Sequence, residues 1–326
     1  MEDRPQNTDD QLIPHDMPPV PEFKPALQPS YARTLFYGPE GLRPGWGLAF
    51  YSLLFYGLQL AAVRWVGTLH WGILWSMTLE ECGVLIAALA PAFLMARVEK
   101  RKFGSYGLPL NGALGKLFWT GAAWGFAAIT LLMVLLYGLH AFDFGHFVLH
   151  GGRIIKFAVF WGAFFLLVGL FEEFLLRGYM QFTLTRAAGF WPAALLLSCA
   201  FGLMHLQNSG EQWPGLVAVF VIGLFFCLTL RRTGNLWFGV GFHMAWDWGE
   251  TFFYSVPDSG TMFPGHLLKS SLHGSRWLTG GPVGPEGSAL CFLVIAIAAV
   301  AFSRRYPEIK YRRSKGQTPS SHINHA

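Results

Sequence analysis

Apolar residues run along this chain in long, nearly uninterrupted segments, separated by short polar or glycine-rich stretches. About 20 consecutive apolar residues suffice for an α-helix to cross a bilayer. The pattern therefore predicts an all-α, polytopic transmembrane bundle of about eight spans. We place them at residues 46–66, 71–96, 117–139, 155–186, 191–205, 216–230, 236–253 and 288–302.

The fourth segment is predicted to continue as one helix past its charged residues as far as Arg186. It contains no proline, and Gly178 is the only weak point in its second half. A turn at Ala188 and Gly189 then leads into the fifth segment, which begins near Trp191. The fourth and fifth segments are thus expected to form an antiparallel hairpin.

The polar stretches define the remaining organisation. The proline-rich residues 1–44 are expected to form a disordered cytoplasmic tail without a cleavable signal peptide. The glycine-rich stretch 256–287 is too polar to span a membrane and is expected to be a partly ordered cap outside the cell. The predicted units are 1–44 (tail), 45–150 (N-terminal transmembrane helices), 151–255 (core), 256–287 (extracytoplasmic loop), 288–303 (last transmembrane helix) and 304–326 (basic cytoplasmic tail).

Composition agrees with a membrane protein: 53% of the 326 residues are hydrophobic and only 13% are charged. The net charge of +5 does not indicate nucleic-acid binding, because the positive residues lie at segment ends instead of on one amphipathic face. Their distribution follows the positive-inside rule and predicts that both termini are cytoplasmic. The charges assigned to the cytoplasmic ends are Lys100, Arg101, Lys102, Arg177, Arg186, Arg231, Arg232 and the basic residues after 303. The four cysteines lie in four different apolar segments without CxxC spacing and are read as buried thiols.

Two adjacent acids and an arginine lie at the end of the apolar part of the fourth segment: Glu172, Glu173 and Arg177. An ionisable group inside a membrane costs several kcal/mol, so it indicates a functional site with a partner. Glu173 and Arg177 have the four-residue spacing of a favoured helical ion pair, which leaves Glu172 free. Glu172 and His205 are the same number of residues away from the hairpin turn. Because both helices rise by the same distance per residue, Glu172 should lie level with His205 on the fifth segment.

The seventh segment carries a second polar pair, since His243 and Asp247 are four residues apart on one helical face. Together with Glu172 and His205 they are predicted to converge on one polar cavity. In such a site Glu172 is a candidate general base for water. Glu250, farther along the same segment, is predicted to reach the rim of this cavity.

Two other features are given structural roles. The paired acids Glu80 and Glu81 in the second segment have no arginine four residues on, so we expect them to line the cavity mouth without a catalytic role. The tetrapeptide Gly-Pro-Glu-Gly occurs at 38–41 and at 284–287, and turn chemistry accounts for both copies.

Three motifs in this order resemble the CPBP family, which joins CAAX-type prenyl endopeptidases with bacteriocin-processing and immunity proteins. The motifs are Glu172-Glu173-x-x-x-Arg177, Phe201-x-x-x-His205 and His243-x-x-x-Asp247, and the resemblance covers roughly residues 155–255. The stretch 280–288 also looks like bacterial members of that family. The resemblance implies an all-helical bundle with a cavity open towards the cytosol and an intramembrane endoprotease activity. By the same resemblance Glu172 and His205 would activate the attacking water, His243 with Asp247 would hold the oxyanion, and Glu173 with Arg177 would brace the site.

Asp247 is a departure from the best-known prenyl endopeptidases, which have asparagine there, although aspartate is an accepted variant elsewhere in the family. An ionised carboxylate cannot donate to an oxyanion. Asp247 is therefore protonated, or orients His243, or helps to bind a metal. Glu172, His205 and His243 would also form a two-histidine, one-carboxylate zinc set. We expect water activation without a required cofactor and leave zinc open as the alternative.

The leading hypothesis is an intramembrane peptidase that acts on a membrane-bound or lipid-modified peptide. We expect an integral protein of a bacterial cytoplasmic membrane whose partners are the lipid bilayer and a peptide or lipoprotein substrate, with no nucleic acid. A non-proteolytic immunity or scaffolding relative is the first alternative. A proton-coupled carrier is the second, but it would favour internal repeats and paired interrupted helices, which the sequence lacks.

Overall fold

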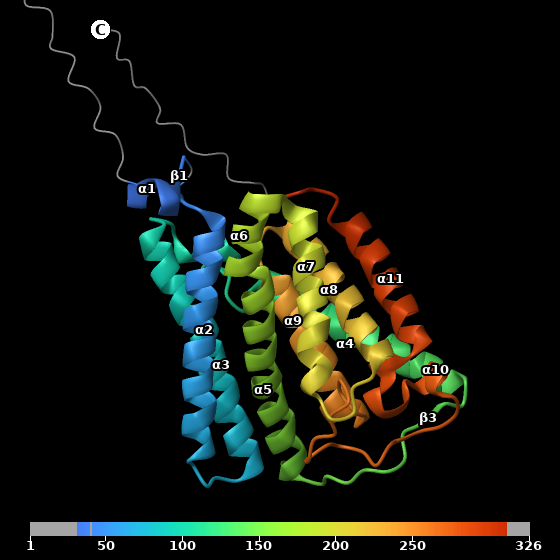
Figure 1. The fold of residues 1–326 in the computed structure, drawn as a ribbon. Helices are drawn as coiled ribbons and strands as arrows, with labels where there is room; N and C mark the ends of the chain where they lie inside the picture. The colour runs from blue at the N-terminus through green and yellow to red at the C-terminus, as the bar shows by residue number, and fades with distance from the viewer. Residues whose placement is uncertain (1–30, 40, 312–326) are drawn as a thin grey trace, which may run out of the picture.

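The computed structural model describes residues 31–39 and 41–311, which form an all-α bundle (Figure 1). The helices are α1 (Tyr31–Phe36), α2 (Pro44–Gly67), α3 (Ile73–Val98), α4 (Lys116–Gly138), α5 (Gly152–Arg177), α6 (Tyr179–Ala188), α7 (Phe190–Met204), α8 (Trp213–Thr233), α9 (Trp237–Trp248), α10 (Arg276–Thr279) and α11 (Ala289–Arg305). A π-helical segment, Gly249–Tyr254, continues α9. Four 3₁₀ turns are Phe103–Tyr106, His205–Gln207, Gly281–Val283 and Pro285–Gly287. The strands are two-residue pieces: β1 (Tyr37–Gly38) pairs with β2 (Gly41–Leu42), and β3 (Phe142–Asp143) with β4 (Ser271–Leu272), both antiparallel.

Each predicted span coincides with a helix. Six helical segments of the described chain are long and apolar enough to cross a membrane: α2, α3, α4, the α5–α6 unit, α7 with the turn that follows it, and α8. α9 has 12 residues before its π-helical continuation, and α11 has 17. The fold class is therefore the predicted all-α membrane bundle, while the number of eight crossings stays a prediction.

The fourth predicted span is interrupted, so the prediction of one unbroken helix to Arg186 was wrong at one residue. Gly178 separates α5 from α6, with backbone angles of φ −85° and ψ −116° that lie outside the helical region. A Cβ at this position would lie 2.3 Å from the carbonyl oxygen of Phe174 and would collide with its ring. The helical path still reaches Ala188, but it changes direction at the glycine.

Glycines allow α4 and α9 to approach each other closely. A Cβ at Gly121 or Gly125 of α4 would lie 2.1 Å from the backbone oxygen of Phe238 or Phe242 on α9. Small residues four apart let membrane helices pack backbone to backbone. α9 also packs against α5, so it is held between α4 and α5. This arrangement presents the polar residues of α9 to the acidic end of α5.

Basic residues gather at one end of the bundle, where α3, α6, α8 and α11 finish. The residues at or just beyond these helix ends are Lys100, Arg101, Lys102, Arg186, Arg231, Arg232, Arg304 and Arg305. Fewer lie near the opposite end: Arg64, Arg153, Lys156, Lys269 and Arg276. α2 begins and α11 ends at the same end of the bundle (Figure 1). A cytoplasmic location for this end remains a prediction.

Arg177 was counted among the charges at a helix end, and this was wrong. Its side chain is 0% exposed, because it is paired with Glu173 inside the bundle. It therefore neutralises an interior acid and does not contribute to the charge at the membrane surface.

The polar stretches contain more structure than their composition indicates. Part of the predicted tail is ordered, because α1 and the β1–β2 hairpin lie within residues 31–42; the rest of that tail, and the end of the basic tail from 312, lie outside the described residues. The cap, defined here as residues 256–287, is anchored by the β3–β4 pairing and by the 3₁₀ turns before α11. Its residues therefore have fixed positions beside the bundle.

Candidate active site

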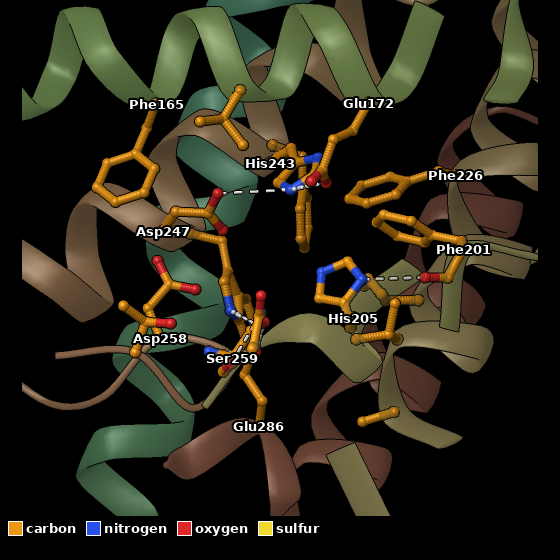
Figure 2. Close-up of a pocket in the computed structure, with 18 of the residues that line it drawn as sticks. Phe165, Glu172, Phe201, His205, Phe226, His243, Asp247, Asp258, Ser259 and Glu286 are labelled. Carbon is orange, nitrogen blue, oxygen red and sulfur yellow. Dashed lines mark hydrogen bonds and ion pairs between the residues drawn. The ribbon is translucent and has the colours of Figure 1, made fainter. Parts of the chain in front are cut away.

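A cavity of about 250 Å³ lies between α5, α7, α8 and α9 and is bordered by the cap. Figure 2 shows the side chains that face it, with Glu172 on α5 on one side and Ser259 and Glu286 on the other. Four of the residues predicted from the sequence line it together: Glu172, His205, His243 and Asp247. Their convergence is thus a structural fact, and their catalytic roles remain to be tested.

His243 is the centre of this polar group. Its Nε2 atom lies 3.5 Å from Glu172 Oε2 and 3.4 Å from Asp247 Oδ2, while its Nδ1 atom lies 3.3 Å from Glu173 Oε1. The ring stacks on Phe226, with 5.3 Å between the ring centroids. Acids on both sides and an aromatic face fix the imidazole, and a cationic ring would donate on both sides.

Glu173 and Arg177 lie behind the cavity, in the packed interior. Arg177 NH1 is 3.1 Å from Glu173 Oε1, and both side chains are at most 1% exposed. The guanidinium also lies 4.4 Å from the ring centroid of Phe201. The predicted division of labour between the two acids agrees with this geometry, since Glu173 is paired and Glu172 faces the cavity.

His205 has a defined ring orientation. It follows α7 directly, and its Nδ1 atom lies 3.0 Å from the carbonyl oxygen of Phe201. A ring nitrogen that faces a carbonyl oxygen must carry the proton, so the neutral ring has Nε2 as its unprotonated nitrogen. Because His205 lines the cavity, this nitrogen is available there as a base or as a ligand.

The ion-pair partner of Glu172 differs from the one that residue counting predicted. Glu172 and His205 face the same cavity, but the ionisable partner of Glu172 is His243. The count assumed one continuous helix on each side of the turn, whereas Gly178 interrupts the helix between α5 and α6, and α7 packs more extensively against α6 than against α5. Level positions therefore share a cavity without a direct contact.

Five residues of the cap were not foreseen as part of this cavity: Asp258, Ser259, Thr261, Phe263 and Glu286. Glu286 accepts hydrogen bonds from Trp246 Nε1 at 3.1 Å and from the Ser259 backbone N–H at 3.1 Å. Turn chemistry alone therefore does not account for the second Gly-Pro-Glu-Gly. The sequence feature that could have indicated this role is the position of Glu286, an acid immediately before an apolar helix.

The second predicted acid pair splits between two environments. Glu81 lines the cavity beside Glu172, and its Oε1 atom is buried without a hydrogen-bond partner among the described residues. Both Glu80 and Glu81 also line an adjoining groove between α2, α3 and α5, which has a volume of about 470 Å³. The predicted position at a cavity mouth fits this placement.

The donor set proposed for zinc was tested against the geometry. Among the described residues, the acids and histidines whose ligand atoms all lie within 4.8 Å of one another are Glu250, Asp258 and Glu286. Glu172, His205 and His243 do not meet that condition, whereas zinc ligands at 2.0–2.2 Å from one ion would. This set therefore does not form a ready-made zinc site, and no step below depends on zinc.

Two expectations about orientation conflict. The cavity is bordered by the cap and by the segment between α7 and α8, both of which lie at the end of the bundle opposite the basic residues (Figure 1). If the basic end is cytoplasmic, the cavity reaches the other face of the membrane. The prediction that the cavity opens towards the cytosol and the prediction that the basic end is cytoplasmic are therefore incompatible in this structure.

Comparison with known proteins places this site within a family. Residues 154–249 match the family model described as type II CAAX prenyl endopeptidase Rce1-like, which is less than a third of the chain but includes all six predicted site residues. No curated protein and no solved structure matches the chain. With its apolar helices, the chain is an integral membrane protein. Through residues 154–249 it is similar to the type II CAAX prenyl endopeptidases of the CPBP family, which are membrane proteases.

Proposed function

We propose that this protein is an intramembrane endopeptidase that hydrolyses a peptide bond of a membrane-associated or lipid-modified, CAAX-like substrate. The observation that carries the proposal is the cavity itself. A carboxylate, Glu172, and an unprotonated histidine nitrogen, His205 Nε2, face one space that also holds the fixed imidazole of His243.

Glu172 and His205 would prepare the water. Glu172 would take a proton from a water molecule that His205 helps to hold, which makes the oxygen nucleophilic. That oxygen adds to the carbonyl carbon of the scissile bond, and the carbonyl electrons move to its oxygen. When the C–N bond breaks, the proton returns to the leaving amine nitrogen.

His243 would stabilise the developing oxyanion. Its Nε2 atom faces the cavity, and an N–H there can donate to the negative oxygen of the tetrahedral intermediate. The one N–H on Nε2 serves one acceptor at a time, so Asp247 Oδ2, 3.4 Å from that same nitrogen, would hold the ring in place until the oxyanion forms and would balance the charge of the ring. Of the three roles open to Asp247, orientation of His243 is the one that this contact supports. Glu173 and Arg177 act as positioning residues, through the 3.3 Å contact between Glu173 Oε1 and His243 Nδ1.

The substrate would reach the site from the cap end or laterally. The groove lined by Glu80 and Glu81 adjoins the cavity and borders apolar residues of α2 and α3. Such a path suits a peptide that is already held at the membrane by an apolar or lipid-modified segment. We further propose that no metal is required, because Glu172 and His205 can activate water alone.

The experiment is peptide cleavage by the full chain purified in detergent. A library of membrane-associated peptides, with and without a prenylated cysteine, is incubated with the parent, with His205→Ala and with the exposed control Glu308→Gln, and the products are identified by mass spectrometry. We expect specific products from the parent and from Glu308→Gln, with and without a chelator, and a large loss for His205→Ala.

Two outcomes would contradict the proposal. Saturable peptide binding without any cleavage would support the non-proteolytic alternative. Loss of cleavage on chelation, restored by zinc, would overturn the metal-free mechanism.

A further inference from the structure

Three acids at the junction of α9, the cap and α11 form a compact oxygen cluster. Glu250 lies in the π-helical segment, Asp258 in the cap, and Glu286 in the 3₁₀ turn before α11. One carboxylate oxygen from each lies within 4.8 Å of those of the other two. Two ligands of one ion at about 2.4 Å can be at most about 4.8 Å apart, so the three oxygens meet the distance condition for a shared ion.

Glu250 is the acid of this cluster whose buried carboxylate has no hydrogen-bond donor in the described part of the chain. Its side chain is fully buried, and neither carboxylate oxygen has a hydrogen-bond partner among the described residues. The indole of Trp246 lies beside the cluster, but its single N–H donates to Glu286 Oε1 at 3.1 Å. A buried ionised carboxylate without a partner is strongly disfavoured, so Glu250 lacks something that the protein itself does not provide.

The other two acids are held in place by donors that leave coordination capacity free. Asp258 accepts a hydrogen bond from Thr251 Oγ1 at 3.0 Å. Glu286 Oε1 accepts from Trp246, and its Oε2 accepts from both the backbone N–H and the hydroxyl of Ser259. Each carboxylate oxygen has two lone pairs, so Oε2 is saturated, whereas Glu286 Oε1 and the Asp258 carboxylate keep a free lone pair for an ion.

The cluster has no positive counter-charge in the described chain. No lysine or arginine of residues 31–39 and 41–311 forms an ion pair with any of the three acids. His243, which lines the same cavity as Asp258 and Glu286, is already flanked by Glu172, Glu173 and Asp247. The site therefore needs either bound protons or a bound cation.

We propose that Glu250, Asp258 and Glu286 bind a hard divalent cation, with Ca²⁺ as the ion that fits best. The ligands are all oxygens and include no histidine or thiol, which favours Ca²⁺ or Mg²⁺ over zinc. The irregular arrangement from three separate segments suits the flexible coordination of Ca²⁺ better than the strict octahedron of Mg²⁺. The π-helical turn that presents Glu250 is a distortion often found at functional sites.

The site is separate from the proposed catalytic group. Asp258 and Glu286 line the cap end of the cavity and lie beyond the segment that matches the family model, as does Glu250. A bound ion would connect the end of α9 to the cap and to the start of α11. It would thereby hold in place the wall of the cavity opposite Glu172.

Terbium luminescence tests binding directly. Tb³⁺ substitutes for Ca²⁺ at oxygen sites, and Trp246 stands beside the cluster to sensitise it. In the full chain in detergent we expect a saturable signal on tryptophan excitation that Ca²⁺ displaces. Glu250→Gln and Asp258→Asn should each weaken Tb³⁺ binding by more than ~10–100-fold, which is the loss expected for a residue that only hydrogen-bonds a metal ligand. The exposed acid change Glu308→Gln should have no effect.

Thermal unfolding separates a cation from bound protons. In chelator, Glu250→Gln removes an unpaired buried acid, so the variant should unfold at a higher temperature than the parent. In excess Ca²⁺ the parent gains stability through binding and the order should reverse. If Glu250→Gln does not fold, Asp258→Asn allows the same comparison.

Three results would overturn the inference: no Ca²⁺-displaceable Tb³⁺ signal, displacement by Zn²⁺ but not by Ca²⁺, or an order of unfolding temperatures that is the same in chelator and in Ca²⁺. The experiments measure ion binding and stability. The cation site can therefore be confirmed or refuted independently of the proposed peptidase activity.

Discussion

The buried pair of Glu173 and Arg177 gives a quantitative prediction about stability. Arg177→Met keeps most of the side-chain volume but removes the positive charge. Glu173 then remains in the interior with a side chain only 1% exposed. Removal of one partner from a buried ion pair costs about 3–5 kcal/mol, because the other charge is left uncompensated. Since His243 Nδ1 still lies 3.3 Å from Glu173 Oε1, we expect the lower half of that range.

The double variant Glu173→Gln/Arg177→Met isolates the charge term. With both charges removed no ion remains uncompensated, and such replacements are often close to neutral. We therefore expect the double variant to be more stable than Arg177→Met alone by at least ~2 kcal/mol. Loss of the contact between Arg177 and the Phe201 ring, ~0.5–2 kcal/mol, should persist in both variants.

The assay is the free energy of unfolding in mixed micelles, measured for the parent, the two single variants and the double variant. Arg304→Met, at the exposed end of α11, is the matched control and should be within ~0.5 kcal/mol of the parent. The reasoning is refuted if Arg177→Met loses less than ~1 kcal/mol, or if the double variant is no more stable than Arg177→Met.

Three further predictions concern packing, the histidine partner and pH. Gly125→Leu should lower the free energy of unfolding by at least ~1–3 kcal/mol, because its Cβ would lie 2.1 Å from the Phe242 oxygen, whereas Gly57→Ala on an open face of α2 should change it little. Asp247→Asn, which can still hydrogen-bond His243, should keep more cleavage activity than Asp247→Leu; equal activities would contradict the orienting role. Burial raises the pKa of Glu211, so folding favours its protonated form and the parent should lose stability as the pH rises above ~4.3. The unfolding temperature of Glu211→Gln should therefore rise relative to that of the parent as the pH increases from 5 to 8. A difference between the two unfolding temperatures that does not change with pH would contradict this.

The sequence was sufficient to predict the helices and four polar residues of the central cavity, Glu172, His205, His243 and Asp247. Apolar length marks membrane helices directly, and ionisable residues within them are so unfavourable that Glu172, His205 and His243 stand out. The four-residue spacing also predicted the pair of Glu173 with Arg177, because that contact lies within one helix.

Contacts between helices were harder to predict. Counting residues along a hairpin gave the right cavity for Glu172 and His205, but the break at Gly178 made His243 the ion-pair partner of Glu172. Glu286 was read as part of a turn, since its contacts with Trp246 and Ser259 join segments that no local pattern connects. Tertiary packing, which sequence periodicity does not encode, decided each of these cases.

The most direct test of the central claim is the initial rate at which Glu172→Gln cleaves a peptide that the parent cleaves. The amide introduced by this substitution would keep the size of the side chain and its place beside His243 but could not accept a proton from water. A general base contributes about 10²–10⁴-fold to the rate, so we predict a loss of that size with folding and peptide binding unchanged. A rate within tenfold of the parent would contradict the assignment of Glu172 as the base of an intramembrane peptidase.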